Sequence, residues 1–249
     1  MSADNSGILL SVVIPAYNEE SRLPQTLTAV VNYLKHQPYT WEVAVVNDGS
    51  TDRTSQVVEN AGNNDQRVWL LQYGSNRGKG YAVRYGMLRV SGKYRLFMDA
   101  DNSTTIDHFD QFLPLLRADT QVVIGSRATQ GAEIAVHQAW WKEFLGVLGN
   151  RWIRCWAMPG IQDTQAGFKV FTGEAAEVVF PRLTIDRWGF DVEALAVARL
   201  RGYKIAERPI HWANDPNTKV GFKTYFEVLL EVVKVRWNIW RGVYDRPPK

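Results

Sequence analysis

The sequence has only one cysteine, Cys155, so no disulfide can form within the chain. A lone cysteine is typical of a reducing compartment, and Cys155 is expected to be a small core side chain rather than a nucleophile. No run of about 18 uncharged apolar residues is present, which is the length that a bilayer-spanning helix needs. The first residues, Met1 to Gly7, are polar and lack the basic and then apolar pattern of a secretion signal. These absences predict a cytoplasmic protein.

Excess charge of one sign is also lacking. The formal net charge is +3, which is too small to indicate a nucleic-acid-binding protein. No internal repeat, low-complexity tract or Pro/Gly-rich linker marks a domain boundary, and 249 residues are enough for one large α/β domain with a single core. Tryptophan, by contrast, is abundant: most of the ten lie from Trp140 onward, so the two halves of the chain differ in character.

Short apolar runs alternate with helical patterns in the first half, which predicts parallel strands joined by crossover helices. The expected strands are Leu9–Ile14, Trp41–Asn47, Val68–Tyr73, Tyr94–Met98 and Gln121–Ile124. The expected helices are Glu20–Lys35, Asp52–Asn60, Gly80–Val90 and Ile106–Leu116. In an open α/β sheet, ligands bind outside the carboxyl ends of the strands. The polar motifs that follow the first, second and fourth strands are therefore expected to meet at one edge.

A pair of aspartates, Asp99 and Asp101, follows the fourth expected strand and leads into the turn-prone Asn102 and Ser103. Two carboxylates at this spacing can reach one hard divalent cation, and the turn leaves room for a phosphate. Such oxygen ligands suit Mg²⁺ or Mn²⁺. Most Asp-x-Asp triplets are solvated turn carboxylates, so the pair alone says little.

The aspartate pair arrives in order behind two other strings, Val12–Glu19 and Val45–Asp52. This ordered set resembles the inverting nucleotide-sugar glycosyltransferases of family 2. The resemblance implies a GT-A fold, with three α/β/α layers around a mostly parallel sheet. It also implies a metal at Asp99 and Asp101 that neutralises charge on the leaving nucleoside diphosphate. Ser103 is expected as a weaker third ligand, which water can replace.

The resemblance assigns the nucleotide pocket to four residues near the first two strand ends: Pro15, Tyr17, Glu19 and Asp48. The Asp48 carboxylate stands where it can accept hydrogen bonds from a base or ribose. Arg77 and Lys79 lie in a glycine-containing loop ahead of a helix, where backbone can approach an anion. The glycine spacing is not that of a Walker loop, and a solvated basic turn is the alternative interpretation.

Two strings in the second half, Gln162–Lys169 and Asp186–Glu193, are more specific. Together they resemble the dolichyl-phosphate glucosyltransferases and, more broadly, the polyprenyl-phosphate hexose synthases, from about Leu9 to Lys219. That resemblance implies transfer of a hexose, with UDP-glucose as the expected donor, to a polyprenyl or dolichyl phosphate. The change of character near Arg127 predicts one domain with a nucleotide-sugar half at about residues 8–125 and an acceptor half at 126–220, followed by a C-terminal amphipathic helix at 221–241.

Five further side chains are assigned to substrate by this resemblance. Arg127 has a planar fork that suits a phosphate, and Lys142 offers a compact second charge. Lys219 resembles an element that contacts the donor diphosphate. Gln165 and Trp188, from the two acceptor strings, complete the substrate-binding set.

The acceptor chemistry needs no strong general base. A phosphate monoester has a second pKa of about 6 and is already a nucleophile at neutral pH. Asp163 and Asp191 are therefore expected to orient neighbours or hold the sugar during an in-line displacement with inversion, which gives a β-linked product.

Other functions stay open at this point. A GDP-mannose donor is one alternative, and a hydroxyl acceptor with Asp163 as the base is another. A nucleotidyltransferase is disfavoured because the first strand is not followed by a glycine-rich loop. A catalytically dead binding protein is disfavoured by the intact aspartates and Arg127.

From Gly221 to Arg241 the sequence predicts an amphipathic helix. Its apolar positions are Phe222, Tyr225, Phe226, Leu229, Val233, Trp237 and Trp240, with Lys223, Lys234, Arg236 and Arg241 among them. One interpretation packs this helix on the sheet. The other lays it in a membrane interface, with tryptophans at headgroup depth and cations toward anionic lipid, where Trp140 and Trp141 would also fit. A peripheral contact with the cytoplasmic membrane face is therefore an expectation.

Overall fold

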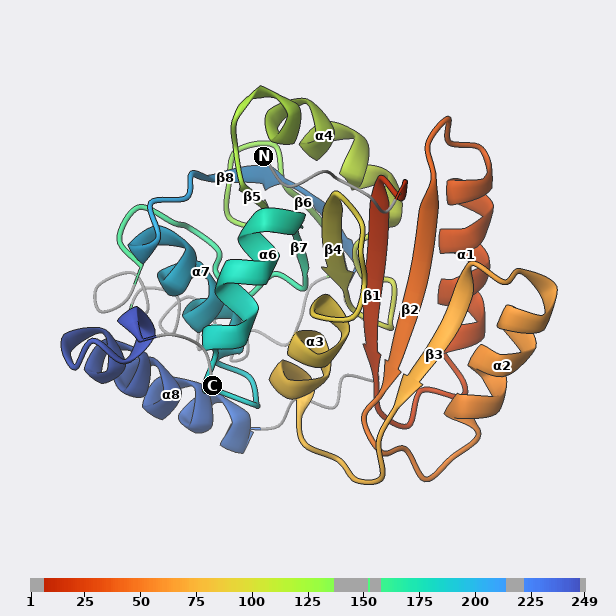
Figure 1. The fold of residues 1–249 in the computed structure, drawn as a ribbon, viewed down its shortest axis with the longest axis horizontal. Coiled ribbons are helices and arrows are strands. Elements are labelled where there is room, and N and C mark those ends of the chain that lie inside the picture. The colour runs from red at the N-terminus through yellow and green to blue at the C-terminus, as the bar shows by residue number, and fades with distance from the viewer. Residues whose placement is uncertain (1–6, 137–151, 153–157, 214–221, 247–249) are drawn as a thin grey trace.

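The computed structural model describes residues 7–136, 152, 158–213 and 222–246 (Figure 1). Its centre is a seven-stranded sheet with the order β3-β2-β1-β4-β7-β5-β8. The strands are β1 (Leu10–Ala16), β2 (Trp41–Asn47), β3 (Val68–Gln72), β4 (Tyr94–Met98), β5 (Val122–Ser126), β7 (Phe168–Thr172) and β8 (Ile205–Pro209). β7 runs antiparallel between β4 and β5, and the other pairings are parallel. The predicted mostly parallel sheet is confirmed.

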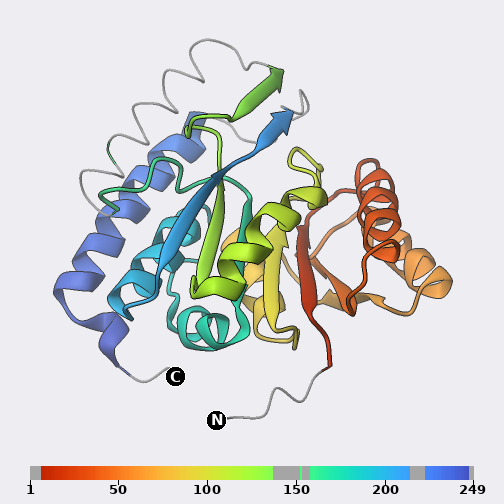
Figure 2. The ribbon, with the colours of Figure 1, turned by 90° about the horizontal axis from the view of Figure 1, so that it is seen from above.

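Helices cover both faces of this sheet, which makes three layers (Figures 1 and 2). They are α1 (Leu23–Lys35), α2 (Thr54–Asn64), α3 (Lys79–Met87), α4 (Phe109–Ala118), α6 (Gly173–Val179), α7 (Phe190–Leu200) and α8 (Phe222–Trp240). Short 3₁₀ turns are η1 (Ile106–His108), η2 (Phe180–Arg182) and η3 (Val243–Asp245). α1 begins later than predicted, with Pro24 in its first turn, because the residues before it form the loop after β1.

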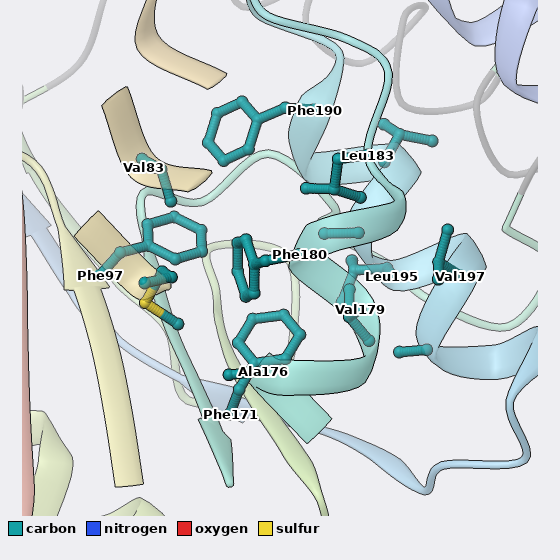
Figure 3. Close-up of a cluster of buried hydrophobic side chains, with 14 of the residues drawn as sticks. Val83, Phe97, Phe171, Ala176, Val179, Phe180, Leu183, Phe190, Leu195 and Val197 are labelled. Atoms are coloured by element: carbon teal, nitrogen blue, oxygen red, sulfur yellow. The ribbon is translucent and has the colours of Figure 1, made fainter. Parts of the chain in front are cut away.

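The buried side chains form one cluster on each face of the sheet. In β1, Val13 belongs to the cluster that includes buried residues of α3, α6, α7 and α8, whereas Val12 and Ile14 belong to the cluster that includes residues of α1, α2 and α4. Successive strand residues point to opposite faces, so a fully apolar strand supplies both cores. In the first cluster, Phe171 lies 5.1 Å from Phe180, measured between ring centroids, and the close-up in Figure 3 shows these rings between β4, β7 and the helices.

β6 (Glu133–Val136) and β9 (His211–Ala213) form a separate two-stranded parallel sheet. The backbone N–H of Ala213 donates to the Ser103 carbonyl at 2.9 Å. The small sheet is thereby tied to the turn that follows Asp101. β6, β7, β8 and β9 are not among the predicted strands.

Candidate active site

The loops after β1 and β2 are joined side by side at the carboxyl edge of the sheet. Asn18, which has a left-handed φ of 55°, receives a hydrogen bond at Oδ1 from the Thr51 backbone N–H (2.8 Å). Its own N–H donates to the Ser50 hydroxyl (2.9 Å), and the Glu20 N–H donates to the Asp52 carboxylate (3.0 Å). The predicted convergence of these two motifs is therefore present.

Asp48 is buried and accepts four hydrogen bonds from within the chain. The donors are the Tyr73 hydroxyl (2.8 Å), the Asn76 side-chain amide (2.9 Å) and the backbone N–H groups of Arg77 (2.7 Å) and Gly78 (3.0 Å). Four donors use the full accepting capacity of a carboxylate. In this structure Asp48 fixes the loop of Arg77 and Lys79, and its contact with a base or ribose stays a prediction.

The start of α3 is covered by the second acceptor string. Backbone N–H groups of Gly80 and Tyr81 donate to the carbonyls of Arg187 (3.2 Å) and Asp186 (3.0 Å). A Cβ at Gly78, where φ is 105°, would lie 2.5 Å from the Asp186 carbonyl oxygen. The amide groups of Gly80 and Tyr81 are thus used by the chain itself and do not point at an anion. Arg77 is exposed and stacks over the Tyr81 ring at 3.7 Å.

Lys79 reaches the aspartate pair directly. Its Nζ lies 2.5 Å from Oδ1 of Asp99 and 5.8 Å from the ring centroid of Trp188. Burial disfavours the ammonium, yet the neighbouring carboxylates, above all Asp99, raise the pKa of Lys79 above its ordinary value. Lys79 is therefore positively charged at neutral pH and lies directly beside the candidate metal site.

The two aspartates are positioned by elements from both halves of the chain. A Cβ at Gly167 would lie 2.0 Å from Oδ2 of Asp99, so the backbone there packs against the carboxylate. The Thr26 hydroxyl of α1 donates to the Ala100 carbonyl at 2.7 Å, and the Ser103 N–H donates to Asp101 at 3.0 Å. Ser103 thus orients that carboxylate through its backbone. Its role as a metal ligand stays a prediction.

Arg127 and Asp163 form a two-pronged ion pair. Nε and Nη2 of Arg127 donate to the two carboxylate oxygens at 2.7 Å and 3.0 Å, and the Arg127 backbone N–H adds a third bond at 3.0 Å. Burial alone would raise the pKa of Asp163, but the guanidinium overrides it and lowers the pKa to about 2. A carboxylate this acidic and fully paired is a poor general base, so the alternative with a hydroxyl acceptor loses its base.

Lys169 and Asp191 form a second buried ion pair. Nζ of Lys169, in β7, contacts Oδ1 of Asp191 at 2.6 Å and the Ala166 carbonyl at 2.5 Å. Burial lowers the pKa of Lys169 and raises that of Asp191, because both charged forms lose water. Asp191 also acts electrostatically on Lys79 and Arg127, so the two acceptor strings and the aspartate pair form one charged cluster.

The cluster fits a divalent cation that arrives with a diphosphate. Among the described residues, no group of three or more His, Cys, Asp or Glu side chains could hold a metal ion. Burial, and then the charge of Asp99, raises the pKa of Asp101, and a cation would relieve that repulsion. With two carboxylate ligands, the other coordination positions of Mg²⁺ or Mn²⁺ would be filled by water and substrate phosphates, as is usual for Mg²⁺.

The remaining predicted residues lie around this cluster or outside the described part. Pro15 lies in β1 beside Val46 of β2, and Tyr17 is exposed at the same edge. Glu19 is buried and forms an ion pair with Arg22 at 2.5 Å. Gln165 gives its backbone N–H to Asp163 at 3.2 Å. Lys142, Lys219, Cys155, Trp140 and Trp141 fall outside the described residues.

Three residues that contact this cluster are not among the predicted site residues: Gly167, Lys169 and Glu207. The Glu207 carboxylate accepts the backbone N–H groups of Gln162 (2.8 Å) and Asp163 (3.0 Å), which shapes the loop that meets Arg127. Gly167 and Lys169 lie in the first acceptor string, Gln162–Lys169. The spacing within that string does not identify their partners, because Gly167 contacts Asp99 and Lys169 contacts Asp191, and both aspartates lie elsewhere in the chain.

A carboxylate pair beside fixed cations at the carboxyl edge of this mostly parallel sheet defines, with the fold, a glycosyltransferase of the GT-A type. Solved structures share that fold. Glucosyl-3-phosphoglycerate synthase from Mycobacterium tuberculosis, in complex with Mn²⁺, UDP and phosphoglyceric acid, aligns over 98% of this chain and 81% of its own, with a TM-score of 0.67 and 17% identity. Mannosyl-3-phosphoglycerate synthase from Rubrobacter xylanophilus aligns over 95% of this chain and 75% of its own, with a TM-score of 0.64 and 17% identity.

The chain belongs to glycosyltransferase family 2, whose family model matches residues 11–172. It is similar to dolichyl-phosphate beta-glucosyltransferases from three organisms. The protein from Trichomonas vaginalis is 36% identical over 98% of this chain and 78% of its own length. The protein from Mus musculus is 37% identical over 94% of this chain and 77% of its own length. The protein from Saccharomyces cerevisiae is 32% identical over 97% of this chain and 78% of its own length. Within the described residues, no helix is long and apolar enough to cross a bilayer.

Proposed function

We propose that the chain transfers glucose from UDP-glucose to a polyprenyl phosphate such as dolichyl phosphate, with inversion to a β-linked product. The curated relatives named for this acceptor and linkage are similar over nearly the whole chain. The observation that carries the proposal is the contact of Gly167, from the first acceptor string, with Asp99 of the carboxylate pair. It supports an acceptor site built directly against the donor site.

The division of labour follows the two halves of the chain. We assign residues 8–125 to the nucleotide sugar and 126–220 to the acceptor, with the C-terminal helix at 221–241. β7 of the second half lies between β4 and β5 of the first, which supports one shared edge for both substrates. The lipid acceptor implies a peripheral contact with the cytoplasmic face of a membrane.

The chemistry uses the charges of the cluster. Mg²⁺ or Mn²⁺ held by Asp99 and Asp101 would neutralise charge on the leaving UDP. Lys79 adds a fixed positive charge at the same place. Asp163 holds Nε and Nη2 of Arg127, which sets the plane of the guanidinium for a phosphate at its third nitrogen. An acceptor phosphate oxygen attacks the anomeric carbon, and the bond from that carbon to the β-phosphate oxygen breaks with its electron pair leaving on UDP.

The test is transfer of radiolabel from UDP-glucose, and separately from GDP-mannose, into the lipid fraction with a polyprenyl phosphate and Mg²⁺ or Mn²⁺. Wild type is compared with Asp101→Asn and with Asp107→Asn, a matched control whose side chain is largely exposed. We expect label from UDP-glucose in wild type and Asp107→Asn and none in Asp101→Asn. Label from GDP-mannose alone would overturn the donor, and donor hydrolysis without lipid label would overturn the acceptor.

A further inference from the structure

Helix α8 has two apolar faces, and only one of them packs on the protein. Val228, Val232 and Val235 are buried in the core cluster of α3, α6 and α7. The opposite side carries an outer stripe of five large apolar side chains, which are the exposed residues Phe226 (62%), Leu230 (67%), Val233 (43%), Trp237 (54%) and Trp240 (76%). The interpretation that packs this helix on the fold is confirmed for its buried side, and the membrane interpretation stays a prediction for the exposed side.

The outer stripe is one continuous surface. Its members are spaced by four, three, four and three residues, which places them on one side of an α-helix. The rings of Trp237 and Trp240 lie 5.1 Å apart between centroids, so they form one aromatic surface at the C-terminal end. α8 lies on the outside of the molecule in both views (Figures 1 and 2). A contiguous exposed apolar patch of this kind marks an interaction site.

Cations border the outer stripe on both sides. At about 100° per residue, Lys234 and Arg236 lie about 80° to either side of its centre, and both are exposed. Exposed Arg241 follows the last turn. The carboxylate of Glu231 turns inward and accepts the Gly189 backbone N–H at 2.6 Å. Glu227 lies about 100° from the centre on the side of Lys234, so the border carries three cations and one carboxylate. An apolar centre with tryptophans and a border of net positive charge is complementary to an anionic lipid surface.

We infer that the outer stripe of α8 docks the protein on an anionic membrane. A second copy of the chain is the less suitable occupant, because a two-fold interface between two such faces would bring together two borders that each carry net positive charge. The inference deepens the proposed function and rests on it for the identity of the lipid acceptor.

The position of α8 gives this docking a consequence for catalysis. Glu231 holds Gly189, the neighbouring Trp188 ring lies 5.8 Å from Lys79, and Lys79 contacts Asp99 at 2.5 Å. In Figure 1, α8 also lies toward the end of the molecule to which β1, β2 and β3 point. Docking through α8 therefore holds the carboxylate pair near the bilayer surface, where a lipid phosphate is found.

The experiment measures binding of the full chain to vesicles of phosphatidylcholine with or without phosphatidylglycerol. Wild type is compared with Leu230→Asp and Trp237→Asp, and with Leu200→Asp, an exposed leucine on α7 far along the chain from the outer stripe. Lys234→Glu is compared with Lys93→Glu, an exposed lysine elsewhere. We expect wild type, Leu200→Asp and Lys93→Glu to bind the anionic vesicles. The three α8 variants should bind at least about tenfold more weakly.

Transfer assays separate this inference from the proposed function. With a water-soluble, short-chain polyprenyl phosphate, the α8 variants should match wild type, whereas KM for a vesicle-embedded acceptor should rise about tenfold or more. Equal vesicle binding by all variants would overturn the inference while leaving transfer intact. A wild-type dimer that Leu230→Asp converts to a monomer, without vesicle binding by either, would also overturn it in favour of a second copy. No transfer to either acceptor by wild type would overturn the proposed function, and the binding data would still stand.

Discussion

Asp163 keeps its charge inside the fold because Arg127 meets both of its oxygens. A folded-state pKa of about 2, against an ordinary value of 3.8, means that folding favours the ionised form. Such a group adds stability above its unfolded pKa, and this is lost as the pH falls through the folded value. The shift corresponds to about 2 kcal/mol. The pair should therefore stabilise the protein through the neutral range and fail only in acid.

This predicts how Asp163→Asn depends on pH. At neutral pH the variant should lose about 3 kcal/mol or more of unfolding free energy, because it leaves Arg127 without its carboxylate partner. The difference from wild type should stay constant down to about pH 5 and shrink by about 2 kcal/mol toward pH 2. Urea unfolding at a series of pH values measures it. Asp119→Asn, in an exposed pair with Lys204, is the control and should differ little from wild type. A difference that grows in acid would contradict the ion-pair account.

Lys79 competes with a metal ion for Asp99. Removing its charge in Lys79→Met should strengthen Mn²⁺ binding in the absence of nucleotide by about fivefold, since a unit charge about 4 Å away is worth ~1 kcal/mol even in water. The same variant should transfer sugar poorly, because the leaving diphosphate loses a counter-charge. Electron paramagnetic resonance of free Mn²⁺ measures the binding. Unchanged or weaker Mn²⁺ affinity would show that Lys79 does not bear on the carboxylate pair.

The sequence predicts the aspartate pair because its signal is local: two carboxylates end a fully apolar strand. Lys169 gives no such signal. A lysine within a strand ordinarily indicates a solvated face, and its partner Asp191 lies on a different element, so only the fold shows that this lysine is buried. Glu207 is hidden for the same reason, since its partners are backbone amides more than forty residues away.

At the level of whole elements, the loop before β7 controls the position of Asp99. Gly167→Ala places a Cβ 2.0 Å from Oδ2 of Asp99, so either the loop or the carboxylate must move. Displacement of a catalytic group by about 1 Å costs about 100-fold in rate. We expect kcat to fall by about that factor, with a loss of about 1–3 kcal/mol in unfolding free energy.

The matched control is Gly74→Ala, in the loop between β3 and α3. A Cβ there has no heavy atom within 4 Å among the described residues, so activity and stability should stay close to wild type. Steady-state transfer kinetics and urea unfolding measure both variants. Wild-type kcat in Gly167→Ala would mean that the loop yields without moving Asp99.

The sequence predicts strands correctly where strands and helices alternate along the chain. It misses the strand that enters the sheet in the antiparallel direction. β2 and β4 match their predicted bounds because each is a short apolar run between turn residues. β7 is missed because it enters the sheet antiparallel between β4 and β5, and this placement follows from pairing rather than from its own sequence. α8 is predicted as a helix, yet its buried valines and exposed tryptophans separate only when the fold shows which side faces the core.

For the molecule as a whole, the carboxylate pair lowers the stability of the protein without ligand. Burial and Asp99 raise the pKa of Asp101, so the folded state disfavours its ionised form. A group with a raised folded-state pKa stabilises the fold at low pH and loses that contribution as the pH rises through the folded value. At neutral pH the charged Asp101 is therefore a burden on the empty protein, which a bound cation would remove.

Thermal unfolding of Asp101→Asn should expose both effects. Without ligands the variant should melt slightly above wild type, because one of two repelling charges is gone. With Mn²⁺ and UDP at about 100 times their dissociation constant, wild type should gain about 2.7 kcal/mol, or about 5–10 °C in Tm, and the variant little. The order of the two melting temperatures should thus reverse on adding ligand. Asp107→Asn should follow wild type in both conditions. If Asp101→Asn kept the full ligand-induced rise, the metal would have to be held elsewhere, and the pair at the end of β4 would be structural.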